Sequence, residues 1–254
     1  MPVLELRDVR VRFGGADAVD GVSLQVHAGE IVGLIGPNGA GKIVTFNVLS
    51  GLQQPTAGRV LLGGQDVTTA APHVRTAMGL ARTFQVVQLF AGMTVRDNVM
   101  VAAHRFTRAG VVTDALWLPG RRRALLQAGE RADAVLSFLG LEGLAGLDVS
   151  ALPVGQARLV ELARALSLRP TVLLLDEPAS GLDPAETAAF VTLLARIRAV
   201  LGCAILLVEH DMDVVMPLCD HLVVLDFGRV IATGAPEQVR ADPGVQAAYL
   251  GAPA

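Results

Sequence analysis

Residues 31–42 read Ile-Val-Gly-Leu-Ile-Gly-Pro-Asn-Gly-Ala-Gly-Lys, so a short apolar run leads directly into the pattern G-x-x-x-x-G-K. A helical pattern begins where this stretch ends. Glycines allow the backbone N–H groups of such a loop to turn inward around phosphate oxygens, and the N-terminus of the following helix adds partial positive charge at the same place. A glycine-rich turn can also be merely a tight loop, but the flanking strand and helix favour a phosphate-binding loop.

Lys42 is the only lysine among the 21 basic residues of the chain. Its ammonium group is a compact charge on a flexible stem, which suits it to reach the β- and γ-phosphates of a nucleotide, whereas the rigid planar fork of arginine does this poorly. A lysine placed at random among the basic positions would fall here about one time in 21. The position of the lysine therefore supports a phosphate contact independently of the glycines.

A second apolar run ends in two carboxylates, in the stretch Val172-Leu-Leu-Leu-Asp-Glu-Pro178. A parallel strand delivers the residues at its end to the carboxyl edge of the sheet, where α/β proteins bind ligands. We expect Asp176 to hold Mg²⁺ through water, and Glu177 to orient or deprotonate the attacking water. Taken alone, this stretch is commonly a solvated acidic turn. Its position after the phosphate-binding loop predicts a P-loop phosphohydrolase.

The pattern of the remaining chain predicts an α/β fold. Residues 3–13 and 22–27 alternate apolar and polar side chains, as half-exposed antiparallel strands do. Residues 172–175, 204–208 and 222–225 are continuously apolar, like residues 31–35. Such runs, separated by helical stretches, are typical of a parallel sheet that is covered on both faces.

The middle of the chain, between Gln85 and Arg169, lacks such strands and has helical apolar spacing through residues 122–139 and 156–168. Residues 106–123, with three consecutive arginines, read as a loop-rich insertion whose arginines form a solvated face. The sequence therefore predicts one P-loop domain over residues 1–254, with a parallel core sheet, an antiparallel β lobe and an inserted α-helical subdomain at about residues 86–169.

Composition excludes several classes of protein. The 254 residues carry 21 basic and 24 acidic side chains, which leaves no excess positive charge for binding free nucleic acid. The longest apolar runs reach about six residues, whereas a membrane-spanning helix needs ~20. Glu5 and Arg7 interrupt the apolar stretch that a signal peptide requires. The sequence predicts a cytoplasmic protein, in which Cys203 and Cys219 are buried and reduced.

The order of the motifs resembles that of the ATP-binding subunits of ABC transporters. Residues 36–42 are similar to the Walker A motif of this family, and residues 173–177 are similar to its Walker B motif. Leu152-Pro-Val-Gly-Gln156 resembles the signature motif, and Ser180-Gly-Leu-Asp183 resembles the D-loop. So many motifs in family order are a highly specific match.

Three further residues each resemble a single conserved position of the family. Gln85, in Arg-Thr-Phe-Gln, is similar to the Q-loop glutamine, and His210, in Val-Glu-His-Asp-Met, is similar to the switch histidine. Phe13 falls where the family stacks an aromatic ring on adenine. Taken one at a time, Phe13 is equally well a core residue, Gln85 a surface residue and His210 a helix cap.

The resemblance implies that ATP lies between the phosphate loop of one subunit and the signature motif of a second. The implied catalytic residues are Glu177, His210 and Gln85, and the implied Mg²⁺ ligands are Gln85 and Asp176. The residues expected to bind ATP are Phe13, Gly36, Pro37, Asn38, Gly39, Ala40, Gly41, Lys42, Ile43, Val44, Gly155 and Gln156.

Within the family, the chain resembles the longer ATP-binding subunit of branched-chain amino acid importers. The stretches that carry this resemblance include residues 98–104, Val-Glu-His-Asp-Met212 and Ala-Tyr-Leu-Gly251. It implies a pair formed with a second ATP-binding subunit, identical or merely similar, docked beneath two membrane permeases on the inner face of the membrane. An extracytoplasmic solute-binding protein would feed the permeases. The transported solute itself cannot be read from this chain.

The sequence departs from the family pattern directly after Lys42, where two hydroxyl residues are expected and Ile43 and Val44 stand instead. The first hydroxyl normally binds Mg²⁺, and isoleucine supplies no oxygen. Two residues correspond to about 200° of helix rotation, so the hydroxyl of Thr45 points away and cannot substitute. Pro153 stands where many relatives have serine, and in this it resembles the branched-chain subgroup of the family.

Three hypotheses follow from these motifs. The first is an ATPase subunit of an ABC importer, and Glu177, Gln85 and His210 favour it. The second is a subunit that binds ATP but is impaired in hydrolysis by Ile43, and that supports a catalytic partner. The third is a soluble ABC protein of DNA repair or translation, which the single cassette and the slight negative charge disfavour.

Overall fold

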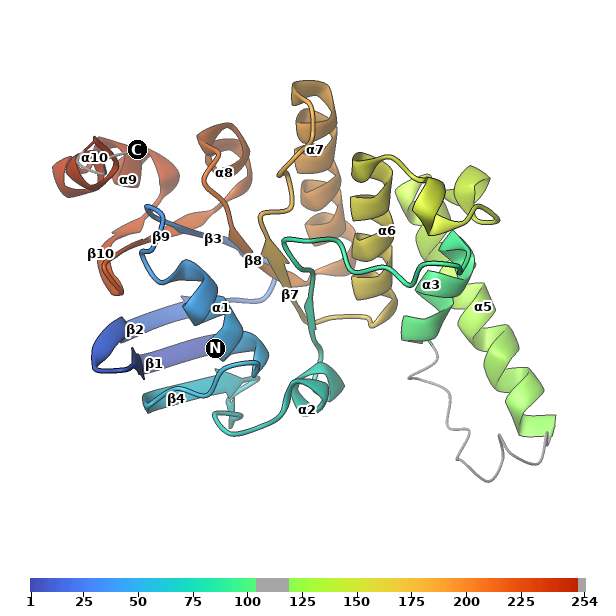
Figure 1. Cartoon of the computed structure of the whole chain (residues 1–254), viewed down its shortest axis with the longest axis horizontal. Helices are drawn as coiled ribbons and strands as arrows, with labels where there is room; N and C mark the ends of the chain where they lie inside the picture. The colour runs from blue at the N-terminus through green and yellow to red at the C-terminus, as the bar shows by residue number, and fades with distance from the viewer. Residues whose placement is uncertain (104–118, 251–254) are drawn as a thin grey trace. The chain divides into compact units, whose positions relative to one another are not determined.

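The computed structural model describes residues 1–103 and 119–250. The chain divides into two compact units: unit 1 joins Met1–Gln85 to Thr171–Ala254, and unit 2 is Val86–Pro170. Figure 1 shows the elements of both along the chain. Residues 106–118 of the expected loop-rich insertion lie outside the described residues.

Unit 1 begins with a four-stranded sheet whose strand order is β2-β1-β4-β5. All its pairings are antiparallel, which confirms the predicted antiparallel lobe. Gly14 and Gly15, both at positive φ, turn the chain between the first two strands. The second strand begins at Ala16, whereas the sequence pattern predicted a strand that begins at residue 22. The strands are β1 (Leu4–Phe13), β2 (Ala16–Val26), β4 (Ala57–Leu62) and β5 (Gln65–Asp66).

A six-stranded sheet of order β10-β9-β3-β8-β7-β6 forms the centre of unit 1. Its inner pairings are parallel, as predicted, whereas β10 pairs with β9 antiparallel at one edge. Every residue of β3, β7 and β8 is buried, which explains their unbroken apolar sequences. The strands are β3 (Ile31–Ile35), β6 (Leu80–Arg82), β7 (Val172–Asp176), β8 (Ala204–Val208), β9 (His221–Asp226) and β10 (Arg229–Gly234).

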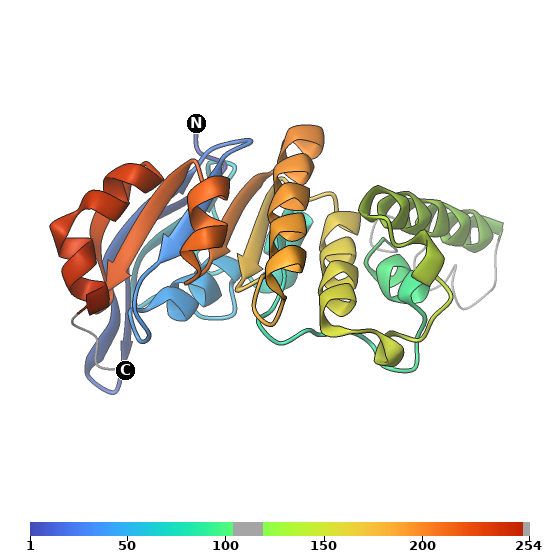
Figure 2. The ribbon, with the colours of Figure 1, turned by 90° about the horizontal axis from the view of Figure 1, so that it is seen from above.

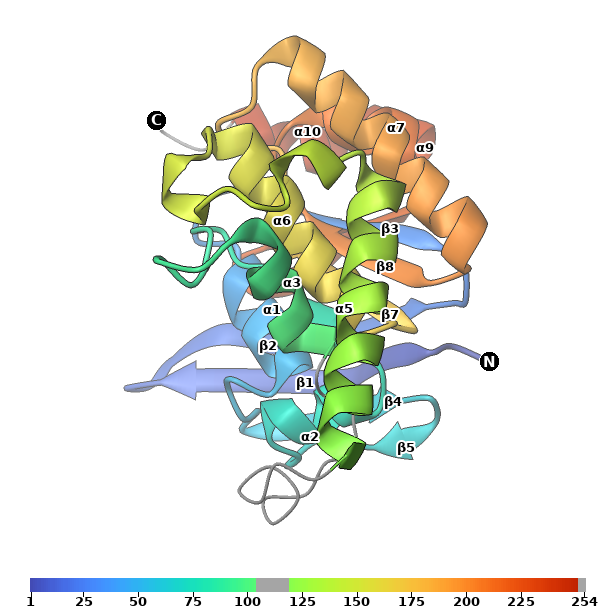
Figure 3. The same cartoon turned by 90° about the vertical axis from the view of Figure 1, so that its right-hand side faces the viewer.

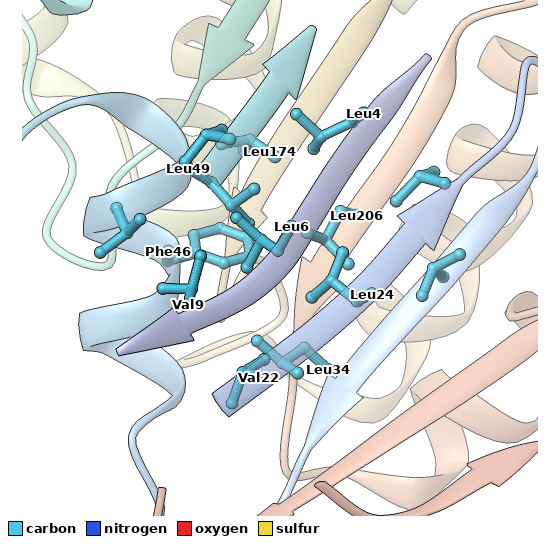
Figure 4. Close-up of a cluster of buried hydrophobic side chains, with 14 of the residues drawn as sticks. Leu4, Leu6, Val9, Val22, Leu24, Leu34, Phe46, Leu49, Leu174 and Leu206 are labelled. Atoms are coloured by element: carbon cyan, nitrogen blue, oxygen red, sulfur yellow. The ribbon is translucent and has the colours of Figure 1, made fainter. Parts of the chain in front are cut away.

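The helix that follows the phosphate loop, α1 (Lys42–Ser50), packs into the core between the two sheets. Its buried Phe46 and Leu49 share one apolar cluster with Leu6 of the antiparallel sheet and Leu206 of the parallel sheet (Figure 4). Burial of such side chains contributes about 1.5–3 kcal/mol each. The cluster therefore fixes the helix that carries the phosphate loop against both sheets.

The remaining helices of unit 1 pack around the parallel sheet. Helices α7 and α8 lie side by side (Figure 2), and α8 contributes Val215, which approaches Gly33 of β3. Asp183 and Glu186 form a capping box at the start of α7. The helices are α2 (Pro72–Ala77), α7 (Pro184–Leu201), α8 (Met212–Leu218), α9 (Pro236–Ala241) and α10 (Pro243–Leu250).

Arg75 of α2 is fully buried and caps the C-terminal end of α1. Its guanidinium donates to the carbonyl oxygens of Val48 and Leu49, at 2.5 and 2.8 Å, and to those of Thr68 and Ala70, each at 3.0 Å. The last carbonyls of a helix lack partners within the helix, and a cation there interacts favourably with the helix dipole. Arg75 thus completes the end of α1 that lies opposite the phosphate loop.

Unit 2 is built from helices that pack on one another (Figure 3). Arg96 of α3 donates to Asp133 of α5 at 2.6 and 2.9 Å. Helix α5 begins at Pro119, so the prediction of a loop that extends to residue 123 is wrong. The helix can begin at this residue because proline is well tolerated in the first turn of a helix. The elements are α3 (Val95–Ala103), α5 (Pro119–Leu139), η2 (Glu142–Leu144), η3 (Val149–Ala151) and α6 (Val154–Ser167).

Candidate functional site

The loop between β3 and α1 has the backbone that its glycines predict. Gly36, Gly39 and Gly41 all have positive φ, at 148°, 80° and 96°. A Cβ atom at Gly36 would lie 2.1 Å from the carbonyl oxygen of Leu225, and one at Gly41 would lie 2.5 Å from that of Ala18. Other residues are therefore excluded at Gly36 and Gly41 by close backbone approach as well as by conformation.

Lys42 begins α1 with its side chain folded back into the loop. Its Nζ donates to the carbonyl oxygens of Gly36 and Pro37, at 2.7 and 2.8 Å, and the residue is 7% exposed. Burial lowers the pKa of Lys42, and the negative charge of Glu177 acts in the opposite direction. The single lysine thus lies in the loop, close enough to Glu177 for their charges to interact.

The two positions after Lys42 differ in their surroundings. Ile43 is 48% exposed, whereas Val44 is partly buried and packs against the core. Thr45 is fully buried and donates its hydroxyl to the carbonyl oxygen of Gly41 at 2.9 Å. The Thr45 hydroxyl is thus already bonded to the backbone of the loop, and Ile43 and Val44 carry no hydroxyl, so none of the three residues offers a free hydroxyl there.

Asp176 ends β7 and is 4% exposed. Its Oδ2 accepts a hydrogen bond from Arg82 Nη2 at 2.9 Å. Its Oδ1 is buried and has no hydrogen-bond partner among residues 1–103 and 119–250. Buried carboxylate oxygens are normally paired, so this oxygen is suited to a cation or to the water that a cation carries.

The structure brings together the three residues implied as catalytic. Gln85 Nε2 donates to Glu177 Oε2 at 2.9 Å, and His210 Nδ1 lies 3.9 Å from Glu177 Oε1. Glu177 follows β7 with a positive φ of 43°, and its N–H donates to the carbonyl oxygen of Val208. Because β7 and β8 are parallel neighbours, their ends place Glu177 and His210 at one edge of the sheet.

Glu209 is a site residue that the sequence reasoning missed. It is 1% exposed, and its carboxylate accepts the backbone N–H groups of Ala179 and His210, at 3.0 and 3.1 Å. Burial raises its pKa, against the opposing effect of these hydrogen bonds. Its place after the apolar strand β8 is the same signal that identified Asp176. Glu209 ties the backbone at His210 to the turn after Glu177.

Phe13, Gly155 and Gln156 lie on other elements than these residues. Phe13 is 50% exposed, on the hairpin whose second strand carries Ala18 beside Gly41. Gly155 and Gln156 lie in the first turn of α6, in unit 2, and are partly exposed.

Comparison with known proteins assigns the chain to a family. A family model described as ABC transporter matches residues 19–180, which is more than half of the chain and includes the phosphate loop and the Asp176–Glu177 pair. The chain belongs to the ABC transporter family. A second model, described as branched-chain amino acid ATP-binding cassette transporter, matches residues 229–254.

Curated relatives extend over nearly the whole length of this ABC subunit. It is 42% identical to the high-affinity branched-chain amino acid transport ATP-binding protein BraF of Pseudomonas aeruginosa, and 43% identical to LivG of Escherichia coli strain K12, which has the same description. Each match spans 250 residues and covers 98% of both chains.

The solved structures that are similar to this chain include the ADP conformation of MJ1267, an ATP-binding cassette of an ABC transporter. It is 30% identical, with a TM-score of 0.85, and the match covers 99% of this chain and 100% of that one. The expected fold, an ABC-type P-loop NTPase, is confirmed. The expectation of an ATP-binding ABC transporter subunit, an ATPase, is confirmed as well.

Proposed function

We propose that this chain hydrolyses ATP to power the import of branched-chain amino acids through an ABC transporter. The names of BraF and LivG and the match at residues 229–254 support this class of solute. The observation that carries the hydrolytic part is Glu177, held by Gln85 at 2.9 Å with His210 on its other side and the charge of Lys42 nearby.

Nucleotide binding is proposed to use the backbone of residues 36–41 and the charge of Lys42. The loop glycines let N–H groups point at phosphate oxygens, and the start of α1 adds its partial positive charge. Lys42 would exchange the carbonyl oxygens of Gly36 and Pro37 for the β- and γ-phosphates. The half-exposed ring of Phe13 would stack on adenine.

Replacing Lys42 by arginine should weaken ATP binding at least about 10-fold, although the charge is kept. The larger planar guanidinium does not fit where Nζ lies 2.7 and 2.8 Å from two carbonyl oxygens. Titration with a fluorescent ATP analogue measures the effect. Arg59→Lys, at a side chain that is 71% exposed, is the matched control and should bind normally. Equal affinities for Lys42→Arg and the wild type would contradict the proposed contact.

Hydrolysis is proposed to proceed with Glu177 as general base. The carboxylate takes a proton from water while the water oxygen bonds to the γ-phosphorus, and the bond from that phosphorus to the bridging oxygen of ADP breaks. Gln85 orients Glu177 through its hydrogen bond. His210 would donate from its ring to the γ-phosphate, and Lys42 would balance the charge on the phosphate oxygens.

The residues present fit a Mg²⁺ ion held mainly through water. Asp176 Oδ1, buried and without a hydrogen-bond partner among the described residues, would hold the ion or one of its waters; the Gln85 side chain is the second proposed ligand. When bound, Mg²⁺ supplies charge neutralisation of the phosphate oxygens. Ile43 contributes no oxygen, so one protein ligand that the family pattern expects is replaced by water.

The transporter is proposed to contain a second ATP-binding subunit, two membrane permeases and an extracytoplasmic solute-binding protein. Gly155 and Gln156 of one subunit would close over ATP on the phosphate loop of the other. Across the described residues, no helix combines the length and apolar character needed to cross a bilayer. The chain is proposed to act at the inner face of the membrane through the permeases, without binding nucleic acid.

A second candidate function is an ATP-binding subunit with weak hydrolysis that supports a catalytic partner. Ile43 favours it, since isoleucine stands where the Mg²⁺-binding hydroxyl is expected. The intact arrangement of Gln85, Glu177 and His210 favours hydrolysis at this chain's own site.

Copurification from membranes tests the proposed assembly and solute. A tagged form of this chain should carry two permeases and a second ATP-binding subunit. The solute-binding protein that docks on these permeases should bind leucine, isoleucine and valine more tightly than glutamate or urea in calorimetry. Tight binding of urea with no response to leucine would reject the branched-chain assignment but leave the ATPase assignment standing.

A further inference from the structure

Arg82, the last residue of β6, forms a buried ion pair with Asp176. Its Nη2 lies 2.9 Å from Asp176 Oδ2, and the two side chains are only 8% and 5% exposed. A buried ion pair of this kind is costly to break, because removal of one partner leaves the other charge uncompensated. The position of the Asp176 carboxylate therefore depends on the position of the Arg82 guanidinium.

The guanidinium of Arg82 is anchored to the helix that carries the phosphate loop. Its Nη1 donates to Asn47 Oδ1 and to Ser50 Oγ of α1, each at 2.8 Å. Its central carbon lies 5.4 Å from the ring centroid of Phe46 and 5.1 Å from that of Phe84. Because aromatic faces attract cations, these rings restrain the guanidinium further. Arg82 thus joins α1 to the end of β7.

The pairing leaves the two oxygens of Asp176 in different states. Oδ2 is held by Arg82, whereas Oδ1 is buried without a hydrogen-bond partner among the described residues. The two oxygens of a carboxylate are chemically equivalent, so the bond to Arg82 does not select one of them. It fixes the plane of the carboxylate and therefore the direction in which the second oxygen points.

We propose that Arg82 is a positioning residue for the cation that accompanies ATP. It fixes the distance between α1, whose start binds the phosphates, and Asp176, and it presents Asp176 Oδ1 to the cation. This inference rests on the proposed role of Asp176. Partners that orient metal ligands typically change metal affinity about 10- to 100-fold when they are mutated. The orientation matters more here because Ile43 supplies no oxygen.

Substitution of Arg82 by lysine tests the proposal, because it keeps the charge and removes the fork that joins Asp176 to Asn47 and Ser50. The metal-free full chain is titrated with Mn²⁺ in the presence of a fluorescent ATP analogue. We expect the Mn²⁺ concentration that gives half of the maximal change in analogue fluorescence to rise about 10-fold. Affinity for the analogue without metal should stay unchanged, since Arg82 contacts no loop residue between 36 and 41 in the hydrogen bonds of the described chain.

Arg75→Lys is the matched control, since Arg75 is also a buried arginine that donates to α1, but to carbonyl oxygens at its far end. It should lower the melting temperature and leave the Mn²⁺ dependence unaltered. A folded Arg82→Lys chain with wild-type Mn²⁺ dependence would overturn the proposal. If Arg82→Lys does not fold, Asn47→Ala removes one anchor of the guanidinium and should shift the Mn²⁺ dependence in the same direction, whereas no shift would reject the inference.

Asp176→Asn separates this inference from the function on which it rests. A rise in the required Mn²⁺ concentration for Asp176→Asn, but not for Arg82→Lys or Asn47→Ala, would reject only the positioning role. Unchanged Mn²⁺ dependence for Asp176→Asn itself would reject the proposed role of Asp176 in metal binding.

Discussion

Replacing Ile43 by threonine should raise the Mg-ATP turnover of the assembled transporter at least about 10-fold, which corresponds to about 1.4 kcal/mol of transition-state stabilisation. Ile43 follows Lys42 in the first turn of α1, and its side chain is 48% exposed, so the substitution does not disturb the core. The new hydroxyl supplies the oxygen ligand that isoleucine lacks. Steady-state ATPase assays over a range of Mg²⁺ concentrations measure both the turnover and the metal requirement.

Two matched variants show whether the gain comes from the hydroxyl. Ile43→Val shortens the side chain without adding an oxygen and should leave turnover near that of the wild type. Val44→Thr places a hydroxyl one position later, where the side chain packs against the core, and should give no gain. If Ile43→Thr leaves turnover unaltered, Ile43 does not limit hydrolysis and its departure from the family pattern has no catalytic consequence.

Replacing Glu177 by glutamine should lower ATP turnover at least about 100-fold while ATP binding is retained. Glutamine has almost the same shape and can still accept the hydrogen bond from Gln85, but it cannot take a proton from water. A radiolabelled ATP hydrolysis assay and a binding titration on the same preparation separate the two effects. Glu237→Gln, at an exposed position in the first turn of α9, is the control and should hydrolyse ATP normally.

A small loss of turnover in Glu177→Gln would contradict the assignment of Glu177 as general base. Loss of ATP binding together with turnover would instead indicate that Glu177 supports the loop through its charge interaction with Lys42. The ratio of the two measurements therefore decides between a catalytic and a structural role.

The fully buried strands were predictable because burial on both faces leaves only apolar residues, as in β3, β7 and β8. The short strands β5 and β6, of two and three residues, were not predicted. Such short runs carry no periodicity, and only their pairing with β4 and β7 makes them strands. The edge strand β10 was not predicted, because the strands of this sheet were predicted from continuous apolar runs. The residues of β10 instead alternate between exposed and partly buried.

The glycines could be predicted because the positive φ angles of the loop favour glycine, and Lys42 could be predicted because a phosphate contact favours a lysine at the end of the pattern G-x-x-x-x-G-K. The approach of Gln85 to Glu177 follows from the order of the parallel strands, since β6 and β7 are neighbours and both end at one edge. The role of Arg82 could not be read, because its partner Asp176 lies 94 positions away and a lone arginine in a strand is most often solvated. Tertiary pairing, rather than local sequence, created that contact.

The site of hydrolysis within the assembled transporter tests the central claim most directly. Trapping with Mg²⁺, vanadate and a radiolabelled, photoreactive azido-ATP marks the subunit whose own phosphate loop holds the newly formed ADP. We expect the label on this chain, in a peptide that contains Phe13, the proposed neighbour of the adenine base, and we expect Glu177→Gln to remove it. Label on the partner ATP-binding subunit alone, with none on the wild-type form of this chain, would contradict hydrolysis at this site and establish the chain as a nucleotide-binding support.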